Sequence, residues 1–275
     1  MNRRIFIIIF IIPLYYQGFG QNLFDKEHSL KFTDYLFKTR QYNYAVLELE
    51  RLIYMDAAND SLKYLLLKSY RFSEQYEKGI TRAGQIYPIL NEMPALLARE
   101  YTYLLLETNS YSNAKFFLSL NKNLAFEEKT RFSLITCLLN GEWGEANNIY
   151  LKNDYQVPVI KIFKTNIEEG LNLKYKSPFL AASMSGIIPG SGKIYTGYWK
   201  DGLFSFFSIG VSSWQACNGF YNEGIGSTYG WIFGGFATIL YLSNIYGSQK
   251  SAKVYNNKHR QDVIFKVKNK LYSND

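Results

Sequence analysis

The sequence contains little cysteine and little histidine, with two of each in 275 residues. Neither Cys137 nor Cys217 has a second cysteine at the spacing of a zinc ligand pair, and two cysteines cannot make a disulfide framework. His28 and His259 lie near opposite ends of the sequence, and no segment supplies a nucleophile with a nearby base. We therefore expect a protein that is not an enzyme and that has no cofactor and no metal site.

Basic residues are absent between Lys200 and Lys250, and only two of the intervening 49 residues carry a charge. This stretch holds two apolar blocks, residues 202–220 and 230–246, separated by a polar turn. At about 1.5 Å per helical residue, each block is just long enough to cross a hydrocarbon core of about 30 Å. The composition therefore predicts a transmembrane helical hairpin.

The N-terminus has the pattern of an export signal. Arg3 and Arg4 precede an apolar run over residues 5–14, and small residues precede a cleavage point at Gln21. An uncleaved anchor is the alternative, although a run of about ten residues is short for a membrane span. We expect residues 1–20 to be a signal peptide and the rest of the chain to be exported.

An aromatic residue followed three positions later by a small residue recurs four times. The pairs are Tyr42 with Ala45, Tyr76 with Gly79, Tyr111 with Ala114, and Trp143 with Ala146, and successive aromatic positions are 34, 35 and 32 residues apart. Each pair lies between two amphipathic helical patterns, as required where two antiparallel helices pack closely. The periodicity predicts a helical repeat domain over residues 21–174, with residues 158–174 as its last helix.

These pairs resemble the tetratricopeptide repeat over residues 28–152, although the Trp-Leu-Gly of the first helix in that family is absent. The resemblance implies a solenoid of stacked helix pairs. Its concave face would bind a peptide or a partner protein, because family members use that surface in this way.

Residues 186–193 are similar to a phosphate-binding P-loop, but the match is incomplete. The motif G-x-x-x-x-G-K-[ST] requires glycine at position 187 and a hydroxyl at position 194, and both positions are isoleucine. The loop should also follow a strand, which this helical sequence does not supply. Nucleotide binding is therefore not expected.

A second set of motifs follows the repeats in a fixed order. It comprises Ser177, Pro178, Pro189, Gly190, Gly192, Tyr195, Gly197, Asp201, Gly202, Asn244, Tyr246 and Gly247, which fit S-P-x-L-A, P-G-x-G-x-x-Y-x-G, D-G and N-I-Y-G. The set resembles the two-transmembrane domain superfamily of bacterial proteins over residues 177–256. This resemblance implies a membrane domain over residues 175–256 and little about its activity.

Small residues recur every four positions in both apolar blocks, from Ser208 to Ala216 and from Gly230 to Gly234. This spacing lets two helices approach closely in lipid. Asn244 is the polar residue of the hairpin with the strongest claim to a function, unless it only forms a hydrogen bond across the hairpin.

The net charge is +8, and seven basic residues follow Tyr246. Lipid headgroups are the expected partner of this basic tail, residues 257–275, and no nucleic acid is expected. The positive charge favours a cytoplasmic C-terminus. If the repeat domain is exported, a cytoplasmic C-terminus requires a third membrane crossing by residues 177–190. An outer-membrane location would not require this third crossing. We expect the inner membrane.

The expected fold is all-α, with a signal peptide, a helix-pair solenoid and a C-terminal transmembrane hairpin. The expected function is that of a non-catalytic, membrane-anchored scaffold that binds a partner protein at the cell envelope, with the repeats on the periplasmic side. The alternative is a component of membrane-protein insertion or envelope transport that acts through the glycine-rich hairpin.

Overall fold

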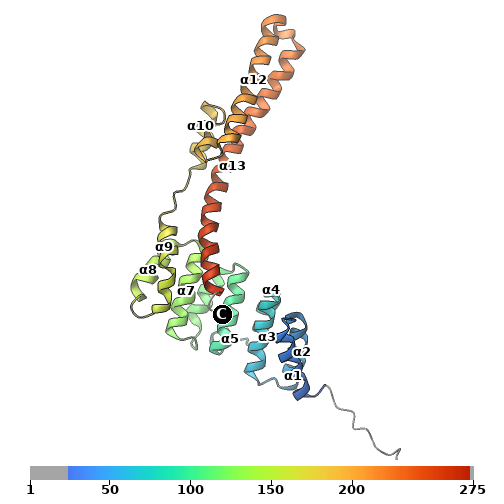
Figure 1. Cartoon of the computed structure of the whole chain (residues 1–275), viewed down its shortest axis with the longest axis vertical. Coiled ribbons are helices and arrows are strands. Elements are labelled where there is room, and N and C mark those ends of the chain that lie inside the picture. Colours follow the sequence, from blue (N-terminus) through green and yellow to red (C-terminus); the bar gives the residue numbers. More distant parts are fainter. Residues whose placement is uncertain (1–23, 273–275) are drawn as a thin grey trace, which may run out of the picture. The chain divides into compact units, whose positions relative to one another are not determined.

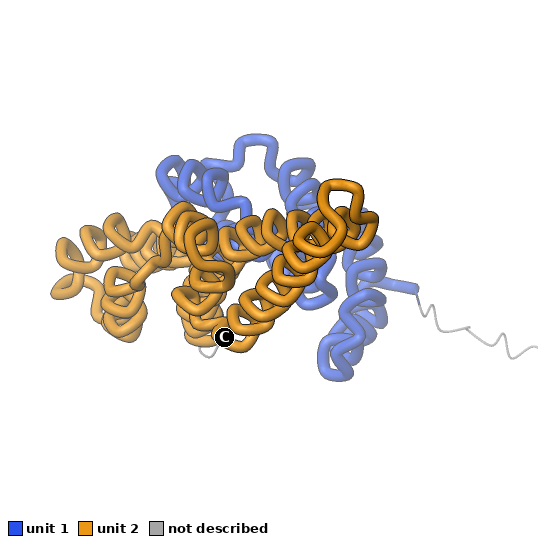
Figure 2. The backbone as a smooth tube through the Cα atoms, turned by 90° about the horizontal axis from the view of Figure 1, so that it is seen from above, with its two compact units in different colours: residues 1–125 blue, residues 126–275 orange. Residues whose placement is uncertain are grey.

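The computed structural model describes residues 24–272, and all regular secondary structure in this range is helical. The chain divides into two compact units, residues 1–125 and residues 126–275 (Figure 2). The boundary lies inside the stretch of predicted repeats, so that three of the four repeated turns belong to unit 1 and the fourth to unit 2. The predicted signal peptide, residues 1–20, lies outside the described residues.

Unit 1 is a series of helix pairs (Figure 1). Its helices are α1 (Lys26–Lys38), α2 (Tyr42–Met55), α3 (Asp60–Phe72), α4 (Tyr76–Ile86), the short 3-10 helix η2 (Leu90–Glu92), α5 (Ala95–Glu107) and α6 (Tyr111–Leu120). Each α-helix contacts the next one, and α3 also contacts α5. The first helices of the second and third pairs, α3 and α5, therefore touch, as in a stack of repeats.

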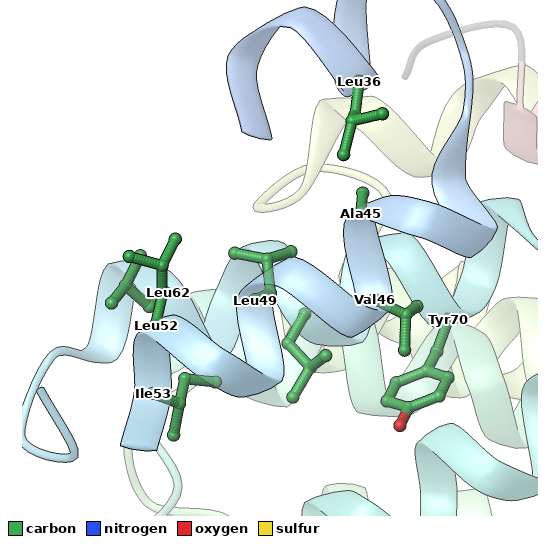
Figure 3. Packing of buried hydrophobic residues seen from close by; sticks show 9 residues of the cluster. Leu36, Ala45, Val46, Leu49, Leu52, Ile53, Leu62 and Tyr70 are labelled. Carbon is green, nitrogen blue, oxygen red and sulfur yellow. The ribbon is translucent and has the colours of Figure 1, made fainter. Parts of the chain in front are cut away.

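The first two pairs share an apolar core. Figure 3 shows Leu36 of α1, Leu49 and Leu52 of α2, and Leu62 and Tyr70 of α3 grouped around the contact between these helices, all of them buried. Burying one leucine side chain contributes roughly 1.5–3 kcal/mol, so this seam is a main source of stability for unit 1.

The four repeated turns share one backbone conformation. The residue two positions before each aromatic residue has a positive φ, and these residues are Arg40 at 57°, Glu74 at 58°, Asn109 at 56° and Gly141 at 75°. The next N–H then donates to the carbonyl five residues earlier at 2.8–2.9 Å, from Gln41 to Leu36, Gln75 to Tyr70, Ser110 to Leu105, and Glu142 to Cys137. This bond ends the first helix of each pair as in a Schellman motif. The repeat is thus visible in backbone geometry.

Unit 2 continues the helical series and adds the hairpin. Its elements are α7 (Phe126–Asn140), α8 (Trp143–Asn153), η3 (Pro158–Phe163), α9 (Lys164–Leu171), α10 (Pro178–Ile187), α11 (Ser191–Tyr195), α12 (Trp199–Glu223), η4 (Gly224–Gly226) and α13 (Thr228–Tyr272). The long helix α13 pairs with α12 and contacts α10, α11, α7, η3 and α9 (Figure 1). It therefore links the hairpin to the helices at the start of the unit.

The predicted basic tail belongs to α13 up to Tyr272 and packs against α9 and η3. Val267 and Leu271 are buried on the inner face of this segment. Lys266 Nζ lies 2.8 Å from a carboxylate oxygen of Glu169, and Lys270 Nζ donates to the Asn166 side chain at 2.6 Å. The lysines thus surround an apolar contact inside the unit.

The hairpin itself is present, but its prediction as a transmembrane element is wrong. None of the helices within residues 24–272 combines the length and the apolarity that crossing a bilayer requires. With 25 residues in α12 and 45 in α13, length is sufficient and apolarity is what fails. The polar residues that interrupt α12 are Ser205, Ser208, Ser212, Ser213, Gln215 and Asn218.

The predicted third crossing is wrong for a different reason. Its segment forms α10, which has only 10 residues. The expected inner-membrane topology and cytoplasmic C-terminus were derived from counted crossings, so they lose their basis.

Candidate functional site

The small residues of the repeated motif all lie at helix contacts. Ala45, Gly79, Ala114 and Ala146 are buried. Gly79 marks a close approach of helices, because a Cβ added there would lie 2.9 Å from Leu104 Cδ1 and 2.9 Å from Tyr70 Cβ. A larger side chain at this position would force α4 away from α3 and α5.

The aromatic residues of the motif also take part in packing. The Tyr42 ring lies 5.6 Å from that of Phe37 and 4.9 Å from that of Phe72. Trp143 is buried and covers Gly170, where an added Cβ would lie 2.4 Å from the indole ring. Tyr76 is half-buried, and so is Tyr111, whose hydroxyl donates to Asn109 at 2.6 Å. These rings position the helices and do not form a ligand site.

The second motif set builds the compact corner around α10 and α11. Ser177 accepts a hydrogen bond from the Leu180 N–H and so caps α10, while Pro178 occupies the first helical position, where no N–H is needed. Tyr195 lies under the Lys176 ammonium, 4.6 Å from it. These residues fix the start of α10 against α11.

Glycines of the same set permit close backbone contacts. Gly190 has φ 84°, and a Cβ there would lie 2.0 Å from the Gly202 carbonyl oxygen. A Cβ on Gly192 would lie 1.9 Å from the Ala181 carbonyl oxygen. Only glycine fits at these two positions, which hold α11 against α10 and α12.

The remaining members of the set have separate environments. They are Pro189, which is partly buried; Gly197, at φ 90°; Asp201 and Tyr246, which are exposed; Gly247, which lies beside Lys193; and Asn244, which is buried. They do not converge on one catalytic centre.

A groove that the sequence did not predict lies in unit 1. It has a volume of about 320 Å³ and is lined by Ile80, Leu90, Tyr101, Leu105, Phe116, Phe117 and Leu120, with Glu77, Asn91, Ser110 and Asn113 as its polar residues. We call it the α4–α6 groove, because these residues come from α4, η2, α5 and α6. Its size and apolar lining suit the binding of one bulky side chain together with the neighbouring backbone of a peptide.

The groove coincides with the longest connection between helices of unit 1. Residues 87–94 join α4 to α5, whereas residues 56–59 suffice between α2 and α3. Pro88 and Pro94 prevent either helix from continuing through this connection, which instead forms η2.

Two asparagines hold η2 in place. Asn121 is buried, and its Nδ2 donates to the Met93 carbonyl at 3.1 Å. Asn123 Nδ2 donates to the Glu92 carbonyl at 2.8 Å. The Lys122 N–H adds a bond to the Asn91 carbonyl at 3.1 Å. This wall of the groove is therefore tied to the end of α6, and nothing in the sequence pattern marked Asn121 or Asn123 for that role.

The polar side chains of the groove are available to a partner. Within residues 24–272, the Glu77 carboxylate and the side-chain amides of Asn91 and Asn113 make no hydrogen bond or ion pair. On the floor, Tyr101 packs edge-on against Phe117 with ring centres 4.8 Å apart. Burial raises the pKa of the Tyr101 hydroxyl, which therefore stays protonated at neutral pH.

The described residues bring together one group of potential metal ligands. Cys137, Glu142 and Glu145 place one ligand atom each within 4.8 Å of one another at the turn between α7 and α8. Each of the three takes part in an interaction within the protein, and a buried thiol with one half-buried and one exposed carboxylate does not match the ligand preference of a particular metal. We assign no metal to this cluster.

The histidines serve helix ends and packing. His28 Nδ1 lies 2.9 Å from Asp25 Oδ1, and Asp25 also accepts the His28 N–H as the cap of α1. The His259 ring packs against Tyr255 at 4.3 Å. Neither histidine lines the α4–α6 groove.

Comparison of the chain with models of protein families, with curated proteins and with solved structures gives no match. The assignment of a function therefore depends on the geometry of the sites described above.

Proposed function

We propose that this protein is a non-catalytic scaffold in which the α4–α6 groove binds a peptide segment of a partner protein. The observation that carries the proposal is an anchored apolar groove with unpaired polar side chains. The charge pattern of residues 1–20 supports the further proposal that the repeats act after export, on the periplasmic side of a bacterial envelope.

The chemistry of the groove specifies the kind of peptide. A floor of Leu105, Phe117 and Leu120 accepts one bulky apolar side chain. The free amides of Asn91 and Asn113 can each donate to and accept from a peptide backbone. Glu77 provides a negative charge with no partner on the protein, which favours a lysine or arginine next to the apolar anchor.

The groove also lacks the parts of a catalytic site. Its hydroxyl groups belong to Tyr101 and Ser110, and within residues 24–272 neither is hydrogen-bonded to Glu77, the one carboxylate among its described lining residues, so no nucleophile is paired with a base. Binding without chemistry is therefore the activity that this geometry supports.

A random peptide library selected on the immobilised full chain tests the proposal. We expect enriched peptides to share a bulky apolar residue next to a basic one. The variants Phe116→Ala and Glu77→Gln should each weaken binding of a selected peptide by about tenfold, the loss expected for a contact at the centre of a small interface.

Leu47→Ala is the matched control, because Leu47 of α2 and Phe116 are both 68% exposed and only Phe116 lines the groove. This control should bind as the unchanged protein does. A selected peptide that binds all three variants equally would show that the groove is not the site, and failure to enrich any motif would also count against the proposal.

The hairpin supports a second candidate activity, contact with a lipid surface. Large apolar side chains are exposed on both of its helices, including Phe204, Phe207, Trp231 and Ile239. An exposed apolar surface of this extent marks an interaction site. Lys200 and Lys250 bound the apolar stretch on the side away from the hairpin turn, as expected where anionic headgroups meet an apolar layer. This contact does not require either helix to cross the bilayer.

Flotation of the full chain with phosphatidylcholine vesicles tests this contact. Replacing Phe207 and Ile239 together by serine should move most of the protein out of the lipid fraction, because both side chains are exposed and each helix of the hairpin contributes one of them. Replacing Leu47 and Tyr54, which are exposed on α2, by serine is the control and should leave flotation unchanged. Equal flotation of both double variants would refute the role of the hairpin.

A further inference from the structure

Unit 2 contains a small cavity lined by α11 and both helices of the hairpin. Its volume is about 170 Å³. Phe204, Ile209 and Leu240 form its apolar lining, and its polar lining consists of Lys193, Ser205, Ser208, Ser243 and Asn244. A cavity needs only about 10–15 Å³ to hold one water molecule, so this space is large enough for a multi-atom ligand. We call it the Lys193 cavity.

Lys193 brings a positive charge to this cavity without a counter-charge. Its Nζ donates to Ser205 Oγ at 2.8 Å, and Ser205 in turn donates to the Asp201 carbonyl at 2.9 Å. Within residues 24–272, no carboxylate pairs with Lys193. Gly247 makes room for this side chain, because a Cβ there would lie 3.3 Å from Lys193 Cε. The ammonium is therefore positioned by the fold and lacks an anionic partner.

The other polar groups of the cavity are also incompletely paired. Asn244 is only 3% exposed; its Nδ2 lies 3.4 Å from the Ser185 carbonyl, and its Oδ1 has no donor in the described chain. The hydroxyls of Ser208 and Ser243 make no hydrogen bond among the same residues. A buried oxygen without a donor costs free energy, so its retention points to a partner that the chain does not supply.

The required partner must satisfy two demands at once. It must be an anion that accepts hydrogen bonds from the ammonium and the serine hydroxyls, and it must carry a donor for Asn244 Oδ1. Monohydrogen phosphate has both, since it combines charged oxygens with a P–OH group, whereas sulfate at neutral pH has no proton to donate. We propose that the Lys193 cavity binds a phosphate group, either as free inorganic phosphate or as the headgroup of a phosphomonoester lipid.

This site differs from the P-loop that residues 186–193 imitate in sequence. The other groups of the cavity come from α12 and α13, so the ligand would be held between helices and not by a loop that follows a strand. The proposal therefore concerns a phosphate group alone and includes no nucleotide.

Calorimetric titration of the full chain with inorganic phosphate, in a buffer free of other oxyanions, tests the proposal. We expect one phosphate per chain and weaker binding of sulfate under the same conditions. Lys193→Ala should weaken phosphate binding by about tenfold, the loss of one charge-assisted hydrogen bond. Lys161→Ala is the matched control, because Lys161 is exposed in η3, does not line the cavity and lies outside the hairpin.

A second variant guards against misfolding of the first. Ser243→Ala removes only an exposed hydroxyl and should weaken phosphate binding less than Lys193→Ala does, with an unchanged circular dichroism spectrum. Equal affinity for phosphate and sulfate would overturn the role given to Asn244. Unchanged phosphate binding by Lys193→Ala would overturn the site.

Vesicles distinguish the two sources of the phosphate group. If the lipid headgroup is the ligand, the full chain should show no binding of free phosphate. It should instead float more with phosphatidylcholine vesicles that contain phosphatidic acid than with pure phosphatidylcholine vesicles. Lys193→Ala should abolish that difference, and Lys161→Ala should not. Absence of both free-phosphate binding and this difference would refute the proposal. Flotation on pure phosphatidylcholine reports only the general lipid contact of the hairpin, so the two proposals can fail separately.

Discussion

The repeat helices of unit 1 and the hairpin of unit 2 are both made of neighbouring helices, but they bury different kinds of side chain. Between α1, α2 and α3 the buried residues are mainly leucines, with Ala45 at a close approach. Between α12 and α13 they are mainly glycine, serine and alanine, while Phe204, Phe207 and Trp214 are exposed. Unit 1 thus buries apolar area within itself, whereas the hairpin leaves its largest apolar groups for another surface to cover.

The comparison predicts where substitutions of large residues matter most. Leu49→Ala in unit 1 should lower the free energy of unfolding by about 2–5 kcal/mol, because it leaves a cavity in a closed core. Leu47→Ala on the exposed side of the same helix should change it by less than about 0.5 kcal/mol. Urea-induced unfolding measures both.

Phe207→Ala applies the same test to the hairpin. We expect a change below about 0.5 kcal/mol, because Phe207 is exposed. A loss as large as that of Leu49→Ala would break the comparison, since it would show that the outer face of the hairpin is already buried in solution by self-association.

The second prediction compares a glycine of α11, beside the hairpin, with a glycine within α12 of the hairpin. Gly192→Ala should destabilise unit 2 by about 1–3 kcal/mol, because its Cβ would overlap the Ala181 carbonyl. Gly210→Ala, in the middle of α12 with no atom within 4 Å of the added Cβ, should stabilise it by about 0.5–1 kcal/mol. Thermal unfolding of both variants gives the comparison, and a shift of the same sign for both would mean that close packing does not govern this region.

The third prediction sharpens the account of the repeated turns. Glu74→Gly should raise stability by about 1 kcal/mol, because glycine adopts the positive φ of this turn without strain and the fourth turn already has Gly141 there. Lys78→Gly, within α4, should instead lower stability by about 0.5–1 kcal/mol. Urea midpoints that move together would show that backbone conformation at the turn is not limiting.

The smallest expected effect is a dependence on pH in unit 1. The pKa of Asp60 lies below its ordinary value, mainly because the Tyr87 hydroxyl donates a hydrogen bond to its carboxylate. Burial raises this pKa, and the nearby Lys63 lowers it further. A depressed folded-state pKa stabilises the protein above the unfolded pKa of about 3.9, and this contribution is lost as the pH falls through the folded value.

Tyr87→Phe should therefore cost a few tenths of a kcal/mol at pH 7, since Asp60 is half exposed. The difference from the unchanged protein should shrink near pH 3. Urea unfolding at both pH values measures it, and a cost that persists undiminished in acid would assign the effect of Tyr87 to packing.

Local patterns predicted the helices and their contacts well where the contacts repeat. Tyr42, Tyr76, Tyr111 and Trp143 each begin the second helix of a pair, as their spacing implied. The same patterns failed for the hairpin, because block length and the absence of basic residues do not measure apolarity. Serines and polar amides lower the apolarity of α12 below that of a membrane span. Absence of charge is a weaker criterion than a high average apolarity.

The candidate sites were harder to predict than the helices. The α4–α6 groove depends on η2 and on Asn121 and Asn123, whose bonds join residues about 30 positions apart. Lys193 and Asn244 drew attention separately in the sequence, but their place on one cavity depends on the packing of α11 against the hairpin.

By itself, the sequence determined the all-helical character of residues 24–272, the period of the helix pairs and the position of the hairpin turn, because propensity, apolar spacing and glycine act over a few residues. Only the tertiary structure decided that the basic tail packs on α9 and η3, that a groove opens beside η2, and that Lys193 faces a cavity without a counter-charge. Those outcomes depend on contacts between segments up to 108 residues apart, as for Lys270 and Ile162, and short-range patterns carry no information about them.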